Sequence, residues 1–199
     1  MVAESPVHAD LVGGPTLGEL AAARGLAPID VMVELSLDER LETKFTVPMV
    51  NDDDEQIGAL LRDENLLLGL SDAGAHTSQL CDANYSTWLL SHWCRDLGVL
   101  NLEQAVWRLT GHPAEVLGVV GRGRIEPGFH ADLVAFDPDR VGTGAAERVH
   151  DLPAGVDRLV APSEGIVHTW VNGVATWRDG AAIPGAGAGR LLRSGATPG

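Results

Sequence analysis

A short apolar run at residues 66–70, Leu-Leu-Leu-Gly-Leu, constrains the fold of this chain more than any other feature. The run is too short for a helix of its own and is bounded by polar residues, which favours a parallel strand buried on both faces. A second apolar, β-rich run occupies residues 45–50, and the acidic residues 52–54 predict the start of a helix between the two runs. Strand, helix and strand in this order predict a parallel sheet of the α/β class.

Two helices are predicted before this unit. Thr16 and Glu19 have the spacing of a capping box, and the helix that they begin is expected to end near Gly25. Pro28 suits the first turn of the second helix. The apolar residues predicted on the inner side of that helix are Ile29, Met32, Val33 and Leu35.

Two further helices are predicted after the unit. Residues 85–97 form a helical pattern, with Asp82 and Asn84 as its expected caps. Asn101 is expected to cap the next helix. The side chains predicted to share one face of the first helix are Tyr85, Trp88, Leu89, His92 and Trp93, and those that recur at helical spacing in the second are Leu102, Ala105, Val106 and Leu109.

After residue 120 the pattern changes to that of a small antiparallel β module. Residues 133–136, Leu-Val-Ala-Phe, predict a strand, and Asn172-Gly173 between two apolar runs is the strongest short signal for a hairpin. Residues 140–165 show no periodicity and are expected to form a long loop. The tail from Ala181 is rich in Gly, Ala and Pro and is expected to lie over the surface or to be mobile.

The charge balance limits the classes of partner. The net charge is −14, from 14 basic and 28 acidic residues, so nucleic acid and anionic membranes are disfavoured as partners. No apolar run approaches the about 18 residues that a membrane span needs, and no signal peptide pattern opens the sequence. Two cysteines in a chain of 199 residues do not form a disulfide scaffold. We therefore expect a cytoplasmic protein.

Asp72 is the best catalytic candidate from position alone. It follows the apolar run at 66–70, and a parallel strand delivers the next side chain to the carboxyl edge of the sheet, where α/β barrels place catalytic groups. The stretch Ala73-Gly74-Ala75 has almost no side-chain bulk and leaves room for a substrate or a metal. The alternative is an ordinary helix cap or loop aspartate.

His76 lies four residues after Asp72 and is the second candidate. A histidine there could bind a substrate carboxylate, polarise a carbonyl group or exchange protons near neutral pH. The alternative is a loop histidine that is hydrogen-bonded to backbone.

Other constellations argue against several enzyme classes. Cys81, His92 and Cys94 match no zinc spacing, so packing roles are expected for them, as for the tryptophans at 88, 93 and 107. No Gly-rich loop opens a helix after a strand, and no Gly-x-Ser-x-Gly motif occurs. Nucleotide binding and serine hydrolase chemistry are therefore not indicated.

Three motifs carry a resemblance to a known family. Residues 68–76 read Leu-Gly-Leu-Ser-Asp-Ala-Gly-Ala-His, residues 110–114 read Thr-Gly-His-Pro-Ala, and residues 123–137 read Gly-Arg-Ile-Glu-Pro-Gly-Phe-His-Ala-Asp-Leu-Val-Ala-Phe-Asp. Val-Asn-Gly at 171–173 and Arg-Asp-Gly at 178–180 resemble the closing hairpin of the same family. Together they resemble the C-terminal half of amidohydrolases, with the N-acyl-D-amino-acid deacylases (D-aminoacylase type) as the nearest branch.

The resemblance implies a fold of the α/β class: a metal-dependent (β/α)₈ TIM barrel flanked by a small β-sandwich. Residues 45–50 and 66–70 would be barrel strands seven and eight. Residues 1–120 would then be the last strands and helices of the barrel, and residues 121–199 the C-terminal β-sandwich module and tail. At 199 residues the chain is too short for a complete barrel, which needs about 250.

The resemblance also implies a reaction, the metal-dependent hydrolysis of the amide bond of N-acyl-(D-)amino acids. Asp72 would take a proton from water bound to Zn²⁺ and pass it to the leaving amine, because zinc lowers the pKa of its water toward about 7. Asp72 could also contact the metal, and His76 would belong to the substrate pocket. Alternatives are a cyclic-amide amidohydrolase, similar to dihydroorotase or hydantoinase, and a non-catalytic truncated remnant with a binding or structural role.

The metal-binding histidines that the resemblance implies are missing from the sequence, in which His8 stands alone. We therefore expect a fragment, a truncated reading frame or one piece of an assembly, and an isolated chain without hydrolytic activity. Half a barrel would leave an apolar face uncovered, so self-association through that face is also expected.

Overall fold

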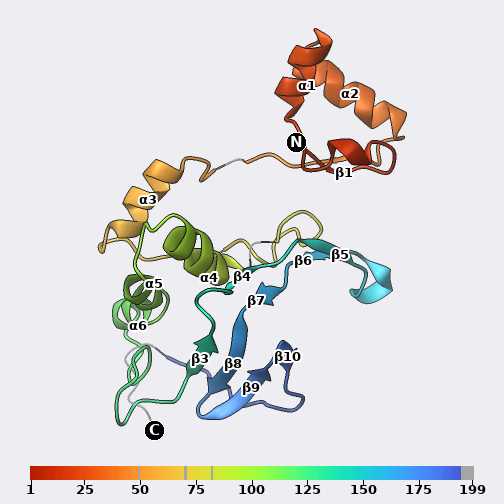
Figure 1. The fold of residues 1–199 in the computed structure, drawn as a ribbon. Coiled ribbons are helices and arrows are strands. Elements are labelled where there is room, and N and C mark those ends of the chain that lie inside the picture. The colour runs from red at the N-terminus through yellow and green to blue at the C-terminus, as the bar shows by residue number, and fades with distance from the viewer. Residues whose placement is uncertain (49, 70, 82, 194–199) are drawn as a thin grey trace. The chain divides into compact units, whose positions relative to one another are not determined.

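The computed structural model describes residues 1–48, 50–69, 71–81 and 83–193 (Figure 1). The chain divides into two compact units, Met1–Asp54 and Glu55–Gly199. The boundary between residues 120 and 121, which separates the expected barrel part from the expected β-sandwich module, remains a prediction.

The first unit is a helical hairpin on a two-stranded sheet. Strand β1 (Val2–Glu4) pairs antiparallel with β2 (Lys44–Phe45), and a 3₁₀ turn at Ala9–Leu11 leads to helices α1 (Leu17–Arg24) and α2 (Pro28–Asp38). The core of this unit consists of Val2, Leu11, Ala21, Val31 and Leu35.

The signals for the ends of these helices are confirmed. The Thr16 hydroxyl accepts a hydrogen bond from the Glu19 amide at 3.1 Å, and the Glu19 carboxylate accepts one from the Thr16 amide at 2.8 Å. Gly25 ends α1 with a φ of 69°, which glycine adopts without steric cost. Pro28 begins α2 as predicted.

The inner face of α2 was predicted only in part. Leu35 is buried, but the side chains of Ile29, Met32 and Val33 are 62%, 38% and 48% exposed. The pattern 29, 32, 33 and 35 spans more than one row of the helix surface, whereas the buried residues, Val31 and Leu35, are spaced i and i+4. The packing partner selects one row of a broad apolar helix, and sequence periodicity does not identify that partner.

A buried carboxylate ties the N-terminal segment to α2. Glu39 is only 3% exposed. Its carboxylate accepts hydrogen bonds from the hydroxyls of Ser5 and Thr43 and from the amides of Val7 at 3.0 Å and His8 at 3.1 Å. Burial raises the pKa of the Glu39 carboxyl, but these hydrogen bonds outweigh it and lower the pKa to about 2.

We expect the first unit to lose stability in acid because of Glu39. The folded-state pKa of about 2 lies below the ordinary value of 4.5, so the carboxylate stabilises the fold above pH 4.5 and this contribution is lost as the pH falls from 4.5 toward 2. Hydrogen exchange at the Val7 and His8 amides measures it. In Glu39→Gln, exchange at pH 7 is expected to be at least about tenfold faster and to change less between pH 7 and pH 3.

The control for this prediction is Glu34→Gln. Glu34 lies on α2, the helix that Glu39 follows as C-cap, and its side chain is 57% exposed in a 3.8 Å ion pair with Arg24. Its loss should therefore leave the two amides unchanged. Exchange at Val7 and His8 that did not change in Glu39→Gln would contradict the assigned role.

The second unit begins with a set of helices. They are α3 (Asp54–Arg62), α4 (Tyr85–Trp88) continued by a π-helical stretch (Leu89–Asp96), α5 (Leu102–Leu109) and α6 (Gly111–Val116). Asn101 caps α5 through a capping box with Gln104, with amide-to-side-chain distances of 2.8 and 3.0 Å, so that predicted cap is confirmed. The core residues of the unit are Leu89, Leu90, Trp93, Leu100, Ala105 and Val141.

Of the side chains predicted to share a face, Leu89 and Trp93 are buried, whereas Tyr85 and Trp88 are 42% and 48% exposed, so the packing role predicted for Trp88 is wrong and that for Trp93 is confirmed. A regular α-helical spacing does not hold here, because π-helical turns are wider and shift which side chains share a face. Asn84 precedes α4 as its N-cap residue without a side-chain hydrogen bond, and Asp82 lies outside the described residues.

The predicted parallel sheet does not occur among the residues that the structure describes. Residues 66–69 make no strand, and residues 45–50 contribute only Phe45, in the antiparallel strand β2; Leu70 and Met49 lie outside the described residues. A parallel strand exists only where a neighbouring strand takes its backbone hydrogen bonds, and no sheet of the described residues borders residues 66–69. Leu66 and Leu67 are 40% and 36% exposed, so this apolar run correctly predicts neither a strand nor burial on both faces.

The predicted β module is confirmed. Strands β3 (Leu133–Phe136), β8 (Ile166–Val171), β9 (Val174–Arg178) and β10 (Ala181–Ala182) form an antiparallel sheet in the order β10-β9-β8-β3. Asn172 and Gly173 have φ of 50° and 77°, the conformation that a two-residue type I′ hairpin turn requires.

The long loop predicted at 140–165 is wrong in part. It contains two antiparallel pairs, β4 (Gly142–Thr143) with β7 (Ser163–Glu164) and β5 (Glu147–Val149) with β6 (Arg158–Val160). Strands of two or three residues are too short for an alternating pattern to appear in the sequence. Within the ranges that the structure describes, no helix is long and apolar enough to cross a membrane.

Candidate functional site

Asp72 lies in an exposed turn between α3 and α4. Its carbonyl accepts a hydrogen bond from the Ala75 amide at 3.0 Å, and Gly74 within the turn has a φ of 94°. The Ser71 hydroxyl accepts a hydrogen bond from the Ala73 amide at 3.3 Å. Among the described residues nothing bonds the Asp72 carboxylate, and no helix begins between Asp72 and α4. The helix-cap alternative for Asp72 is therefore wrong, and the alternative of a loop aspartate stays open.

His76 belongs to the same turn. Its φ of 49° is uncommon for a residue other than glycine. Its carbonyl accepts hydrogen bonds from the amides of Gln79 at 2.7 Å and Leu80 at 3.0 Å, while its side chain is exposed. The structure thus places Asp72 and His76 on one turn.

The end of this turn contacts the β5–β6 hairpin, a contact that the sequence does not reveal. The Leu159 amide donates a hydrogen bond to the Thr77 carbonyl at 2.8 Å, and the Arg148 guanidinium donates one to the Ser78 carbonyl at 3.1 Å. No signal pointed to Arg148, because residues 140–165 have no periodicity and the contact joins residues 70 apart in the chain.

The described residues do not fit a metal site on their own. Within them no group of three or more His, Cys, Asp or Glu side chains could hold a metal ion. Cys81 and Cys94 are free thiols, and burial raises the pKa of Cys94, which disfavours the thiolate that a metal needs. His92 stacks on Trp88 at 4.5 Å. The packing roles predicted for Cys94 and His92 agree with this.

Asp132, within the motif at 123–137, has a structural role. The Asp132 carboxylate pairs with Arg122 and accepts a hydrogen bond from the Asn172 amide at 2.7 Å, while Arg122 donates to the Asn172 side chain at 2.6 Å. Burial raises the pKa of Asp132, but these hydrogen bonds and the Arg122 charge lower it overall. The network joins the loop before β3 to the β8–β9 turn.

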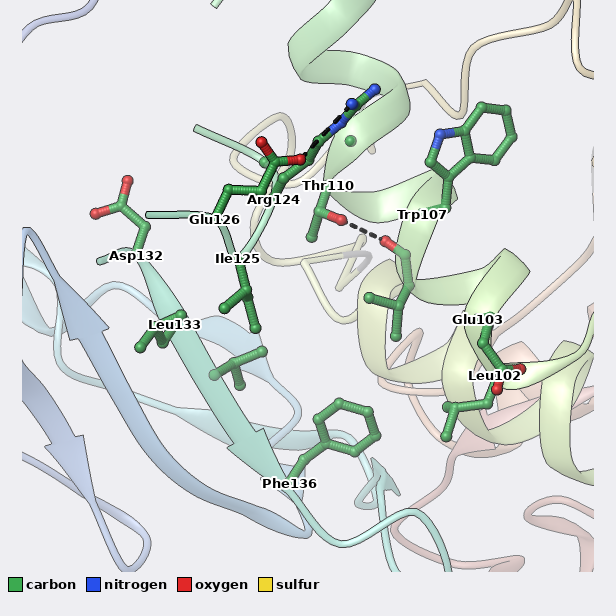
Figure 2. Close-up of a pocket in the computed structure, with 14 residues that line it drawn as sticks. Leu102, Glu103, Trp107, Thr110, Arg124, Ile125, Glu126, Asp132, Leu133 and Phe136 are labelled. Atoms are coloured by element: carbon green, nitrogen blue, oxygen red, sulfur yellow. Dashed lines mark hydrogen bonds and ion pairs between the residues drawn. The ribbon is translucent and has the colours of Figure 1, made fainter. Parts of the chain in front are cut away.

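A surface cavity of about 610 Å³ lies between α5 and β3. Figure 2 shows Trp107 and Thr110 on the helical side and Leu133 and Phe136 on β3, with Ile125 between them. Its lining is mainly apolar and includes neither Asp72 nor His76. This cavity is therefore separate from the predicted catalytic turn.

The sequence matches the amidohydrolase family over residues 1–176, so the chain belongs to that family. Among its relatives is the D-aminoacylase of Alcaligenes xylosoxydans xylosoxydans, which is 32% identical over 184 residues, 91% of this chain and 34% of the relative. The N-acyl-D-aspartate deacylase of the same organism is 38% identical over 102 residues, 50% of this chain and 19% of the relative. The resemblance stated from the motifs is confirmed.

Solved structures agree with this assignment. A D-aminoacylase studied for its binuclear metal center superposes with a TM-score of 0.52 at 28% identity, covering 97% of this chain and 37% of the other. A second D-aminoacylase crystal structure gives a TM-score of 0.51 at 27% identity over the same shares. The fold is that of an amidohydrolase of the α/β class, and the chain spans about a third of the length of these relatives.

Proposed function

We propose that this chain is the C-terminal part of a metal-dependent deacylase of N-acyl-D-amino acids, in which Asp72 transfers the proton. The observation that carries the proposal is the exposed Asp72 carboxylate, which has no partner among the described residues and lies in a turn of small side chains. A structural aspartate in such a turn would bond its carboxylate to nearby amides. The named deacylase relatives support the substrate class.

Amide hydrolysis defines what Asp72 would do. Water attacks the acyl carbon, the carbon–nitrogen bond breaks, and the leaving amine needs a proton. The Asp72 carboxylate would accept the proton of the attacking water and donate it to the amine nitrogen. His76, on the same turn, would bind the carboxylate or the carbonyl group of the substrate.

Zn²⁺ is the metal that the family resemblance implies. The residues that the structure describes include no group of three or more side chains that could hold a metal ion, and Asp72 is the metal contact that the resemblance suggests.

The finer fold is also proposed. Residues 1–120 would complete a (β/α)₈ barrel, and residues 121–199 would belong to a β-sandwich. Support comes from a superposition on D-aminoacylase that covers 97% of this chain. A cytoplasmic location remains a prediction, to which the two free cysteines are suited.

One observation favours a second candidate, a non-catalytic remnant with a binding or structural role. Within the described ranges no cluster of metal-ligating side chains occurs, and a remnant would not need one. The two candidate functions predict different results in a chimera that joins this chain to the rest of a D-aminoacylase. Asp72 would be needed for hydrolysis if the chain is part of a deacylase, and would not affect hydrolysis if the chain is a remnant.

The purified chain is expected to hydrolyse N-acetyl-D-amino acids with added zinc no faster than its Asp72→Asn variant. The reason is that one carboxylate does not form a zinc site, which needs about three protein ligands. Product release and zinc content per chain are the measurements. Stoichiometric zinc and hydrolysis near the rate of a complete D-aminoacylase would contradict this expectation.

A further inference from the structure

The carbonyls of His76, Thr77 and Ser78 all accept hydrogen bonds. The His76 carbonyl is bonded within the turn, by the Gln79 and Leu80 amides. The next two carbonyls, of Thr77 and Ser78, accept their hydrogen bonds from outside the turn. The backbone on the C-terminal side of His76 is thus held at three successive residues.

The two outside donors lie opposite each other on the β5–β6 hairpin. Arg148 on β5 and Leu159 on β6 are cross-strand partners in the antiparallel register. Leu159 donates its amide to Thr77 at 2.8 Å, and Arg148 donates its guanidinium to Ser78 at 3.1 Å. In Figure 1 the yellow segment that contains the turn runs beside β5 and β6. A cross-strand pair that binds two successive carbonyls sets both the place and the direction of that backbone.

Arg148 is itself held in place. Its side chain is 17% exposed and forms an ion pair with Asp157, whose side chain is 30% exposed. The pair limits the rotation of the guanidinium, and a charged donor makes a stronger hydrogen bond to a carbonyl than a neutral one. The positive φ of His76, 49°, is an uncommon conformation that persists only where surrounding contacts stabilise it.

We propose that the β5–β6 hairpin positions the Asp72–His76 turn and that Arg148 is its positioning residue. The inference rests on the proposed function of that turn. Arg148 would act through the backbone at Ser78 and not on the substrate, so its effect is to hold His76 and Asp72 in the geometry that the reaction needs. Catalytic loops are commonly held by such a scaffold, and a misplacement of about 1 Å can lower a rate about 100-fold.

Hydrogen exchange in the 199-residue chain tests the positioning without any activity. Arg148→Met removes the donors but keeps an apolar stem, and exchange at the Gln79 and Leu80 amides is expected to become about tenfold faster. Arg148→Lys keeps the charge and one donor group and is expected to restore part of the protection. Amides of the β8–β9 hairpin should exchange as in the unaltered chain.

Arg158→Met is the matched control. Arg158 lies on the same hairpin and pairs with Asp151 through two hydrogen bonds of 2.7 Å, and neither bond reaches the turn. The proposal is overturned if Arg148→Met leaves Gln79 and Leu80 unchanged. It is also overturned if exchange rises equally in the β8–β9 hairpin, or if Arg158→Met has the same effect as Arg148→Met.

Kinetics in a chimera with D-aminoacylase separate this inference from the proposed function. In the chimera this chain replaces the matching third of the Alcaligenes enzyme. Arg148→Met should lower kcat/KM about tenfold, with unchanged metal content, and Arg158→Met should not. An inactive parent chimera would contradict the proposed function, whereas the exchange measurement would still decide whether Arg148 positions the turn.

Discussion

Replacing Asp72 by asparagine is expected to lower kcat about 10²- to 10⁴-fold in a chimera in which this chain replaces the matching third of the Alcaligenes D-aminoacylase. Asparagine keeps the shape of the side chain but cannot accept or donate the proton. KM should change little if Asp72 acts mainly in the transition state. Steady-state hydrolysis of an N-acetyl-D-amino acid measures both quantities, and metal analysis verifies that the variant holds as much metal as its parent.

Asp179→Asn is the control for this result. Asp179 is another exposed turn aspartate of the same unit, with a φ of 48° that asparagine tolerates well. Its substitution should leave kcat within about twofold. The proposed role of Asp72 is contradicted if Asp72→Asn keeps the activity of the parent. A folded, metal-loaded chimera without activity would favour the non-catalytic remnant instead.

The second large effect is expected on stability. Asp132→Ala should destabilise the Glu55–Gly199 unit by about 2 kcal/mol, because it leaves Arg122 without its carboxylate and the Asn172 amide without its acceptor. The side chain of Arg122 is 9% exposed, so water cannot replace the lost partner fully. Urea denaturation followed by tryptophan fluorescence reports on this unit, since all five tryptophans lie in it.

Glu126→Ala provides the comparison. Glu126 lies in the same motif and pairs with Arg124 at 3.9 Å, with side chains that are 51% and 53% exposed. An exposed pair of this kind contributes about 0–1 kcal/mol, so the midpoint of unfolding should shift little. Equal shifts for Asp132→Ala and Glu126→Ala would show that the Arg122–Asp132–Asn172 network does not stabilise the sheet.

The part of the fold that depends on neighbours close in sequence was predictable. The capping boxes at Thr16 and Asn101 and the turn at Asn172-Gly173 occur where their residues indicate. In each of them a short side chain or a glycine meets a backbone group only a few residues away. Strand β3 was also predicted, and its partner β8 is one arm of the predicted hairpin.

The features that failed depend on distant partners. Residues 66–69 are apolar enough for a buried strand, yet they make none, because a strand needs hydrogen bonds from another segment. The inner face of α2 was misassigned for the same reason, since a broad apolar helix surface offers several rows and the neighbouring element selects one.

The family, and Asp72 as the candidate to mutate, follow from the sequence alone, because both rest on residue types at fixed short spacings. Only the tertiary structure revealed that the Asp72 carboxylate has no partner among the described residues and that Arg148 reaches the same turn from the β5–β6 hairpin. Arg148 and Ser78 are 70 residues apart, and no local pattern encodes a hydrogen bond between a side chain and a backbone carbonyl at that separation.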